Sequence, residues 1–165
     1  MVVKSSRAEP APGPALDLAY LGFFLGLRVN QLVTERMRAA GFQHVRESHG
    51  YVVQHLIEQD RSITELARRM EVTQQAASKV VAELADSGVV ELVPGPDRRA
   101  KTVKLSAQGW EAVRLARRVR RQIEGRLIRS AGADRYGAAK EIMAECLKAL
   151  GGLERVRTRR VRAPE

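Results

Sequence analysis

The spacing of apolar residues along the chain predicts a mainly α-helical protein with one short β-hairpin. Apolar residues recur at intervals of three and four, as on one face of a helix, in several separate segments. These segments are residues 15–38, 45–57, 62–70, 73–87, 107–130 and 134–150. The pattern changes at residues 89–93, a valine-rich run, and at 101–105, where polar and apolar residues alternate. The turn-forming residues between these two stretches complete the prediction of a hairpin.

The two short helices before this hairpin have clear start and stop signals. Ser62 and Glu65 have the spacing of a capping box, and Thr73 is suited to cap the next helix. Gly88 is suited to end that second helix. Apolar residues occupy one face of the second helix, which leaves a polar face for another surface. Helix, turn, polar helix and basic hairpin, in this order, predict a winged helix-turn-helix.

The residues of this region resemble the MarR (multiple antibiotic resistance regulator) family of bacterial transcription factors. The resemblance lies in four stretches with the family's order and spacing, at residues 72–84, 88–91, 97–101 and 103–109. They correspond to a threonine-opened recognition helix, a glycine-led entry to the wing, an Asp-Arg-Arg wing tip and a leucine-serine start to the next helix. The match is good from about residue 45 to 109. It implies a winged helix-turn-helix flanked by long dimerisation helices, and a regulator, most often a repressor, that responds to an effector.

Residues expected to contact DNA follow from this resemblance. They are Ser62, Thr73, Gln74, Gln75, Ser78, Lys79, Arg98, Arg99 and Lys101. Gln74 and Gln75 suit base edges, because a glutamine amide can pair with adenine through two hydrogen bonds, whereas Lys79 suits phosphate. Arg98 is expected in the minor groove, with Asp97 orienting the wing, and Arg99 is the alternative. For the two glutamines, the other interpretation is a merely solvated helix face.

The outer helices have apolar faces that the small winged unit cannot cover. On the first helix the expected inner residues are Leu18, Leu21, Phe24 or Leu25, Leu32 and Val33. Burial against the same helices of a second copy would cover these faces, and the resembled family dimerises in this way. We therefore expect a homodimer whose recognition helices enter successive major grooves of a pseudo-palindromic site. The predicted layout is a disordered lead at 1–14, a dimerisation helix at 15–40, the winged helix-turn-helix DNA-binding domain at 41–106, dimerisation helices at 107–153 and a basic tail at 154–165.

Composition narrows the class of partner. A formal net charge of +10 and an isoelectric point near 10.6 favour a polyanionic partner, with double-stranded DNA first and an anionic membrane surface second. The charges gather on the predicted hairpin rather than opposite an aromatic helix face, which favours DNA. A single cysteine excludes an internal disulfide framework, and the apolar run at residues 18–27 lacks a cleavage site. We expect a cytoplasmic protein.

Effector chemistry is indicated only by the resemblance, which implies a cleft for a small aromatic ligand between the dimer helices and the winged unit. Candidate lining residues are Tyr20, Phe23, Arg28, His49, Tyr51 and Trp110. The alternative is that these aromatic residues pack in the core. Cys146 is expected to be a buried, inert thiol. The histidines, His44, His49 and His55, lack the spacing of metal ligands, so neither a metal nor another cofactor is expected.

Three other functions compete with a sequence-specific regulator. An enzyme is disfavoured, because no glycine-rich phosphate loop, helical HExxH motif or nucleophile elbow occurs. A sequence-indifferent architectural DNA-binding protein would show affinity that follows charge and salt alone. A cationic membrane-surface protein would bind anionic vesicles. A defined, two-fold symmetric operator would distinguish a regulator from all three.

Overall fold

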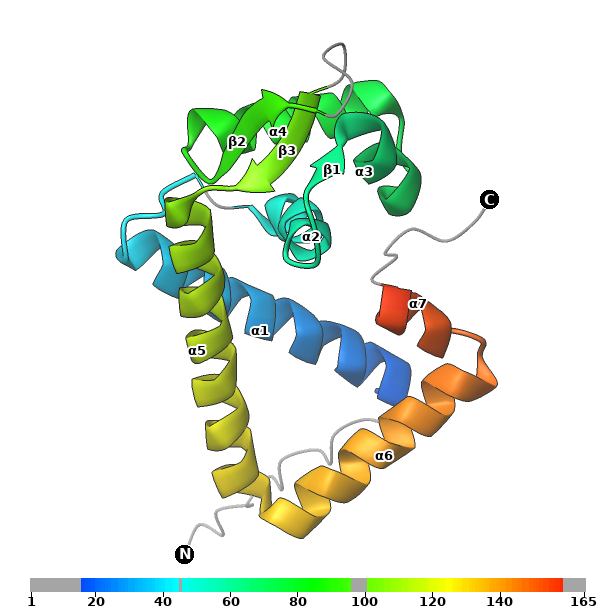
Figure 1. The fold of residues 1–165 in the computed structure, drawn as a ribbon. Coiled ribbons are helices and arrows are strands. Elements are labelled where there is room, and N and C mark those ends of the chain that lie inside the picture. Colours follow the sequence, from blue (N-terminus) through cyan, green and yellow to red (C-terminus); the bar gives the residue numbers. More distant parts are fainter. Residues whose placement is uncertain (1–15, 45, 96–100, 159–165) are drawn as a thin grey trace, which may run out of the picture.

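The computed structural model describes residues 16–44, 46–95 and 101–158, which form helices and one small sheet at one end of the molecule (Figure 1). In chain order the elements are α1 (Leu18–Ala39), α2 (Glu47–Leu56), β1 (Arg61–Ser62), α3 (Ile63–Met70), α4 (Gln74–Asp86), β2 (Val90–Pro94), β3 (Lys101–Leu105), α5 (Ala107–Ala131), α6 (Ala133–Ala149) and α7 (Leu153–Thr158). The predicted fold class, mainly helical with a small β-wing, is confirmed. The predicted lead at residues 1–14 lies outside the described residues.

Helices α2, α3 and α4 and the sheet enclose one aliphatic core. The sheet is antiparallel with strand order β1-β3-β2, and Leu92 of β2 pairs with Val103 of β3. The core residues from different elements are at most a few per cent exposed, and Val52, Leu66 and Val103 are 0% exposed. We call this assembly, residues 46–95 and 101–106, the winged unit. Its core closes within one chain.

The sequence predicted only a two-stranded wing, and the structure adds β1 as a third strand. Arg61 of β1 pairs with Val103, and its side chain is 2% exposed. The Arg61 guanidinium donates from Nε to the carbonyl of His55 at 3.1 Å and lies 3.4 Å from Glu58. This buried arginine thus ties the end of α2 to the sheet. A strand of two residues has no periodicity, so no sequence pattern could indicate it.

The wing is fixed to the start of α5 by Ser106 and two glycines. Gly88 ends α4 with φ +73°, a conformation that suits glycine. The Ser106 hydroxyl donates to the Gly88 carbonyl and accepts from the Gly109 amide at 2.9 Å. A Cβ on Gly109 would meet the Val89 carbonyl oxygen, so the close approach of α5 to the wing depends on glycine here. The predicted leucine-serine start of this helix is confirmed.

The outer helices contrast with the winged unit. α1 crosses α5, and Val33 and Met37 of α1 form a second, small core with Ala112 and Val119 of α5. The part of α1 before Val33 contains no buried residue, and neither does α6. Among the described residues, twelve of the fifteen exposed large apolar side chains belong to α1, α6, α7 or the residues next to them. They are Leu16, Leu18, Tyr20, Leu21, Phe23, Phe24, Leu25, Ile142, Met143, Leu147, Leu150 and Val156, and we call them the outer apolar surface.

One sequence prediction for these outer helices is wrong, that of a buried cysteine. Of the expected inner residues of α1, only Val33 is buried in the single chain. Cys146 is exposed rather than buried, because α6 packs loosely on the rest of the chain. The first part of the predicted basic tail is the short helix α7.

Candidate nucleic-acid interface

A tight turn sets the angle between α3 and α4. Glu71 ends α3 in the left-handed conformation, with φ +55° and ψ +44°. The Val72 amide donates to the Ala67 carbonyl at 3.0 Å, and the Glu71 amide donates to the Arg68 carbonyl at 3.3 Å. These two bonds form a Schellman motif, which closes the end of α3. Thr73 then begins α4 at once, so only three residues separate the two helices.

Helix α4 has one buried and one exposed face. Ala77, Val81 and Leu84 are at most 1% exposed and pack into the winged unit. The Thr73 hydroxyl accepts from the Ala76 amide at 3.1 Å, which confirms its predicted capping role. All the predicted contact residues on this helix and its cap are exposed: Thr73, Gln74, Gln75, Ser78 and Lys79. A polar row of glutamine, serine and lysine at a helix start can reach base edges and phosphates.

Ser62 is placed differently from the other predicted contacts. It is the N-cap of α3 and forms a full capping box: its hydroxyl accepts from the Glu65 amide, and its own amide donates to Glu65 Oε2, each at 3.2 Å. The predicted capping box is confirmed. Because Ser62 is half-buried and its hydroxyl is engaged, its main contribution is to stabilise the start of α3.

The wing is the hairpin of β2 and β3. Lys101 is exposed at the start of β3, where it pairs with Pro94 at the end of β2. Further down, Lys104 makes an ion pair of 3.1 Å with Glu91 across the two strands. The predicted wing-tip residues Asp97, Arg98 and Arg99 lie outside the described residues. Their roles stay predictions from the sequence.

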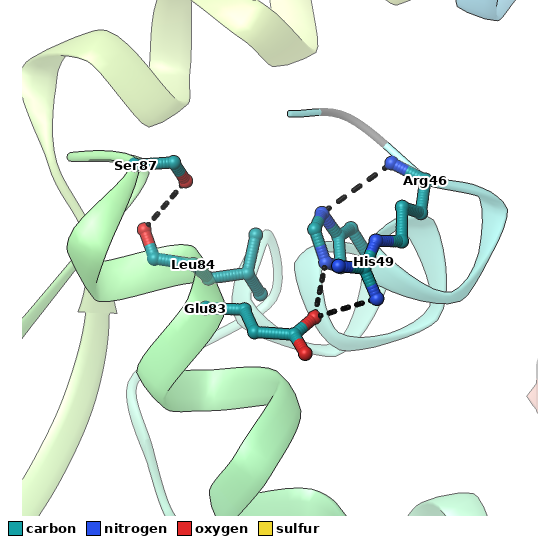
Figure 2. Close-up of polar contacts among 5 residues, drawn as sticks. All are labelled: Arg46, His49, Glu83, Leu84 and Ser87. Atoms are coloured by element: carbon teal, nitrogen blue, oxygen red, sulfur yellow. Dashed lines mark hydrogen bonds and ion pairs between the residues drawn. The ribbon is translucent and has the colours of Figure 1, made fainter. Parts of the chain in front are cut away.

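One carboxylate joins α4 to the start of α2 (Figure 2). Glu83 Oε2 lies 3.2 Å from both His49 Nε2 and Arg46 Nη1. The Arg46 amide donates to His49 Nδ1 at 3.4 Å, so the other ring nitrogen, Nε2, carries a proton to donate to Glu83. The hydrogen bond from His49, aided by the charges of Arg46 and Lys79, lowers the pKa of Glu83 below its usual value near 4.5. We call Arg46, His49 and Glu83 together the Glu83 clamp.

A cavity of about 250 Å³ lies between the winged unit and the outer helices. Its walls include Val33 and Met37 of α1, Val53 and Ile57 at the end of α2, and Ala112 of α5. Its charged lining residues in the described part of the chain are Arg46, Arg117 and Arg120, together with the titratable His49. Arg120 donates to Asn30 Oδ1 at 2.8 Å across the cavity wall. An apolar chamber with arginines at its edge suits a small ligand that carries a negative charge.

The structure brings only two of the six predicted cleft residues to this cavity. His49 and Tyr51 line it, whereas Tyr20, Phe23, Arg28 and Trp110 do not. Tyr20 and Phe23 are not core residues either, since they are 51% and 61% exposed. Arg28 pairs with Glu35 on the surface of α1 at 3.3 Å. Trp110 is exposed near the start of α5.

Sequence reasoning missed the arginines of the cavity and the Glu83 clamp. Arg117 and Arg120 belong to an arginine-rich stretch of α5 that can be seen in the sequence. The sequence did not indicate which helix packs beside these arginines. His49 and Glu83 are 34 residues apart, and nothing in the spacing connects them. In the described ranges, no group of three or more potential metal ligands occurs. No described helix is long and apolar enough to cross a membrane.

The fold and the exposed polar face of α4 define a winged helix-turn-helix protein, and comparisons with known proteins agree. The MarR family model matches residues 46–100. YusO from Bacillus subtilis is similar in structure at 21% identity and a TM-score of 0.67, over 81% of this chain and 94% of that one. The reduced form of MarR from E. coli is similar at 19% identity and a TM-score of 0.68, over 82% and 99%.

A structure of an S. aureus MepR variant bound to an oligodeoxyribonucleotide is also similar, at 14% identity and a TM-score of 0.60, over 81% of this chain and 98% of that one. The chain has no significant match among curated protein sequences. The resemblance drawn from the sequence is therefore confirmed: residues 46–100 match the MarR family model, and the similar structures share this fold.

Proposed function

We propose that the protein is a dimeric, sequence-specific DNA-binding transcriptional regulator. We propose further that it is a repressor and that it responds to a small effector. The observation that carries this proposal is the exposed row Gln74, Gln75, Ser78 and Lys79 on a helix whose opposite face is fully buried. No packing role accounts for two adjacent glutamines on this exposed face. A second support is that the similar MepR variant is bound to an oligodeoxyribonucleotide. Lys101 extends the same polar surface onto the wing, and the net charge of +10 favours a polyanion.

Dimer formation accounts for the outer apolar surface. An isolated chain would expose twelve large apolar side chains on and next to α1, α6 and α7. Burying a side chain of this size contributes about 1.5–3 kcal/mol, so pairing with a second copy is strongly favourable. Two winged units would then present two α4 helices to one face of the duplex, which predicts a pseudo-palindromic operator.

The cavity is the proposed effector site. It lies where the winged unit meets α1 and α5, so a ligand there would touch both the DNA-binding and the proposed dimerising parts. Arg46 and Arg120 at its edge favour an anionic ligand over a neutral one. The aromatic candidates Tyr20 and Phe23 belong instead to the outer apolar surface, where a second copy would cover them.

Selection of bound duplexes from a random DNA pool tests the proposed function directly. A regulator is expected to select a defined site with two-fold symmetry and to prefer it at least about a thousandfold over unrelated DNA. Within that site, Gln75→Ala should raise the dissociation constant about five- to a hundredfold, because one pair of base contacts is lost. Gln122→Ala, an exposed glutamine on α5, is the matched control and should change nothing.

Other results would identify the competing functions. Affinity that follows salt and charge without a preferred sequence would identify an architectural DNA-binding protein. Binding to anionic vesicles without binding to duplex DNA would identify a membrane-surface protein. Equal effects of Gln75→Ala and Gln122→Ala would exclude α4 as the reading element.

A further inference from the structure

Helix α5 has a row of arginines on the face that points away from the core. The helix contains seven arginines, no lysine and two glutamates. Four of the exposed arginines are separated by one or two helical turns, so they follow one line along the helix. They are Arg114, Arg118, Arg121 and Arg129, and we call them the α5 arginine row.

The gap in this row at Gly125 is filled by Arg129. Gly125 lies one turn after Arg121 and one turn before Arg129. Arg129 Nη1 lies 3.5 Å from the point where a Cβ on Gly125 would be, so the Arg129 side chain runs back over the glycine. A positive group therefore lies at each turn from Arg114 to Gly125, over a length of about 16 Å.

The acidic residues of α5 do not neutralise this row. Glu124 pairs with Lys140 of α6 at 3.3 Å and accepts from the Tyr136 hydroxyl at 3.4 Å, so its carboxylate is directed toward α6. Glu111 lies one turn before Arg114 and can offset only one of the charges. Among the described residues, no member of the row makes an ion pair. The row is thus an exposed line of uncompensated positive charge.

The row is separate from the face of α4 that is proposed to meet DNA. Val113 of α5 belongs to the same core as Val81 and Leu84 of α4, so both helices turn their exposed faces away from that shared core. Ala112 and Val119, on the side of α5 opposite the row, pack against α1. Figure 1 shows α5 running from the end of β3 away from the winged unit. The outer apolar surface contains no residue of α5, so the proposed dimer leaves the row open to another partner.

The chemistry of the row fits the phosphate backbone of a duplex. Each strand of DNA has one charge per roughly 3.4 Å, so about five phosphates of one strand match the length of the row. A guanidinium pairs with phosphate oxygens through two hydrogen bonds and keeps its charge at physiological pH. An acidic protein segment would need carboxylates at the matching spacing, whereas any duplex supplies regularly spaced charges. Charge complementarity therefore favours a nucleic acid over an acidic protein.

We propose that the α5 arginine row is a second DNA-binding surface, which holds the phosphate backbone of another duplex segment while α4 occupies the operator. The row would attract this segment without reading its sequence, and the protein would join two segments of DNA. The inference rests on the proposed function for the operator on α4, whereas the attraction of the row for duplex DNA concerns the row alone. Because this attraction is ionic, it should weaken steeply with salt.

A second-duplex capture assay on the full-length protein tests the proposal. The selected operator is immobilised and saturated with protein, unbound protein is washed away, and a labelled duplex that lacks the operator is added at low salt. Wild type should retain the labelled duplex. Arg114→Gln/Arg118→Gln/Arg121→Gln, the row variant, should retain it at least about tenfold less, because three phosphate contacts are lost. The row variant should keep its operator affinity within about twofold.

The matched control removes the same charge without altering the row. In Arg36→Gln/Arg126→Gln/Arg135→Gln, three exposed arginines of α1, α5 and α6 are replaced. This scattered variant should retain the labelled duplex within about twofold of wild type, because its arginines do not lie along one line. Circular dichroism should show the same helix content in all three proteins.

Several outcomes would overturn the proposal. Equal losses in the row and scattered variants would reduce the effect to net charge, and wild type that retains no second duplex would remove it. A row variant that loses the operator as well would place the row within the first DNA site. Polyglutamate or double-stranded RNA that displaces the labelled duplex more effectively than unlabelled duplex would identify an acidic protein or RNA as the partner instead.

Salt dependence separates this proposal from the proposed function. The affinity of the free protein for a duplex without the operator is measured at several salt concentrations. The row variant should lower the slope of log affinity against log salt by about two to three, and the scattered variant by less than about one. A lowered slope in a protein that selects no operator would leave the row standing and remove the proposed function. An operator-binding protein with equal slopes in wild type and row variant would keep the proposed function and overturn the row.

Discussion

The winged unit and the outer helices differ in how completely one chain covers its apolar residues. In the winged unit, Val52, Leu66 and Val103 from three different elements are fully buried, and the ends of α3 and α4 are capped by local hydrogen bonds. In the outer helices, Phe23 of α1 and Leu150 after α6 are 61% and 84% exposed. The first region is complete within one chain. The second region has large apolar side chains like those of a core, but the same chain does not cover them.

This difference separates residues that stabilise the fold of one chain from residues that only a partner could bury. A side chain that is buried in the single chain stabilises the fold whether or not a partner is present. A large apolar side chain that one chain leaves exposed gains its stabilisation only on association. The cavity lies at the boundary between the two regions, so a ligand there would contact both the winged unit and the helices α1 and α5.

Loss of a core side chain should have the largest effect. Leu66 is fully buried on α3, so Leu66→Ala should lower the free energy of unfolding by about 2–5 kcal/mol. Leu150→Ala, at an exposed leucine, is the matched control and should lower it by less than about 0.5 kcal/mol at protein concentrations where the chain is a monomer. Chemical denaturation followed by circular dichroism measures both. Equal losses would contradict the division of the molecule into two kinds of region.

Charges on the outer apolar surface should affect association rather than folding. In Phe23→Glu/Leu147→Glu, two apolar side chains of that surface become carboxylates, and the dimer dissociation constant should rise at least about a hundredfold. Sedimentation at several concentrations measures this change, and circular dichroism should show an unaltered helix content. Leu92→Glu is the control, because Leu92 is an exposed leucine on β2, away from the outer helices. A double variant that associates like the wild type would show that this surface has another role.

The junction of the two regions can be tested at Gly109. Its amide is bonded to Ser106, and a Cβ there would meet the Val89 carbonyl oxygen, a backbone atom that cannot turn away. Gly109→Ala should therefore lower the free energy of unfolding by about 1–3 kcal/mol, although alanine favours helices elsewhere. Gly125→Ala, within the same helix, is the control and should be neutral or stabilising, since only the end of the Arg129 side chain is near. Thermal unfolding of both variants measures the contrast, and destabilisation by both would point to a general effect on α5.

The same division explains how much was predictable from the sequence. The winged unit depends on short-range signals: the Ser62 and Glu65 capping box, the Thr73 cap and the turn at Gly88 each act within a few residues, so the local sequence indicates them. The Glu83 clamp joins residues 34 positions apart and has no local signal. Strand β1 likewise exists only because β3 lies beside it.

The sequence predicted that the outer helices exist, but it did not predict what covers their apolar faces. Their periodicity shows that α1 has an apolar face, but not whether the same chain or a partner covers it. Leu21 and Phe24, which were expected on the inner face of α1, are exposed in the single chain, and their burial against a second copy stays a prediction. Likewise, the aromatic side chains Tyr20 and Phe23 were assigned to a ligand cleft or to the core, and they line neither.

The pH dependence of the Glu83 clamp should be the smallest effect, because this polar contact lies at the edge of a unit stabilised mainly by apolar packing. The folded pKa of Glu83 is lowered, chiefly by its hydrogen bond from His49, so the contact stabilises the fold above the unfolded pKa near 4.5. That contribution is lost as the pH falls through the lower folded pKa. The wild type should therefore exceed Glu83→Gln in stability at pH 7, and the difference should shrink below pH 4.5.

Denaturation of both proteins between pH 7 and pH 3 measures this difference. Glu91→Gln, which breaks the ion pair with Lys104 on the wing, controls for the loss of an exposed carboxylate in the same unit. A difference between wild type and Glu83→Gln that grows toward acid pH would mean that the contact favours the protonated carboxyl. Arg46 and His49 would then not hold α4 through a carboxylate, and α2 and α4 would be held together by apolar packing alone.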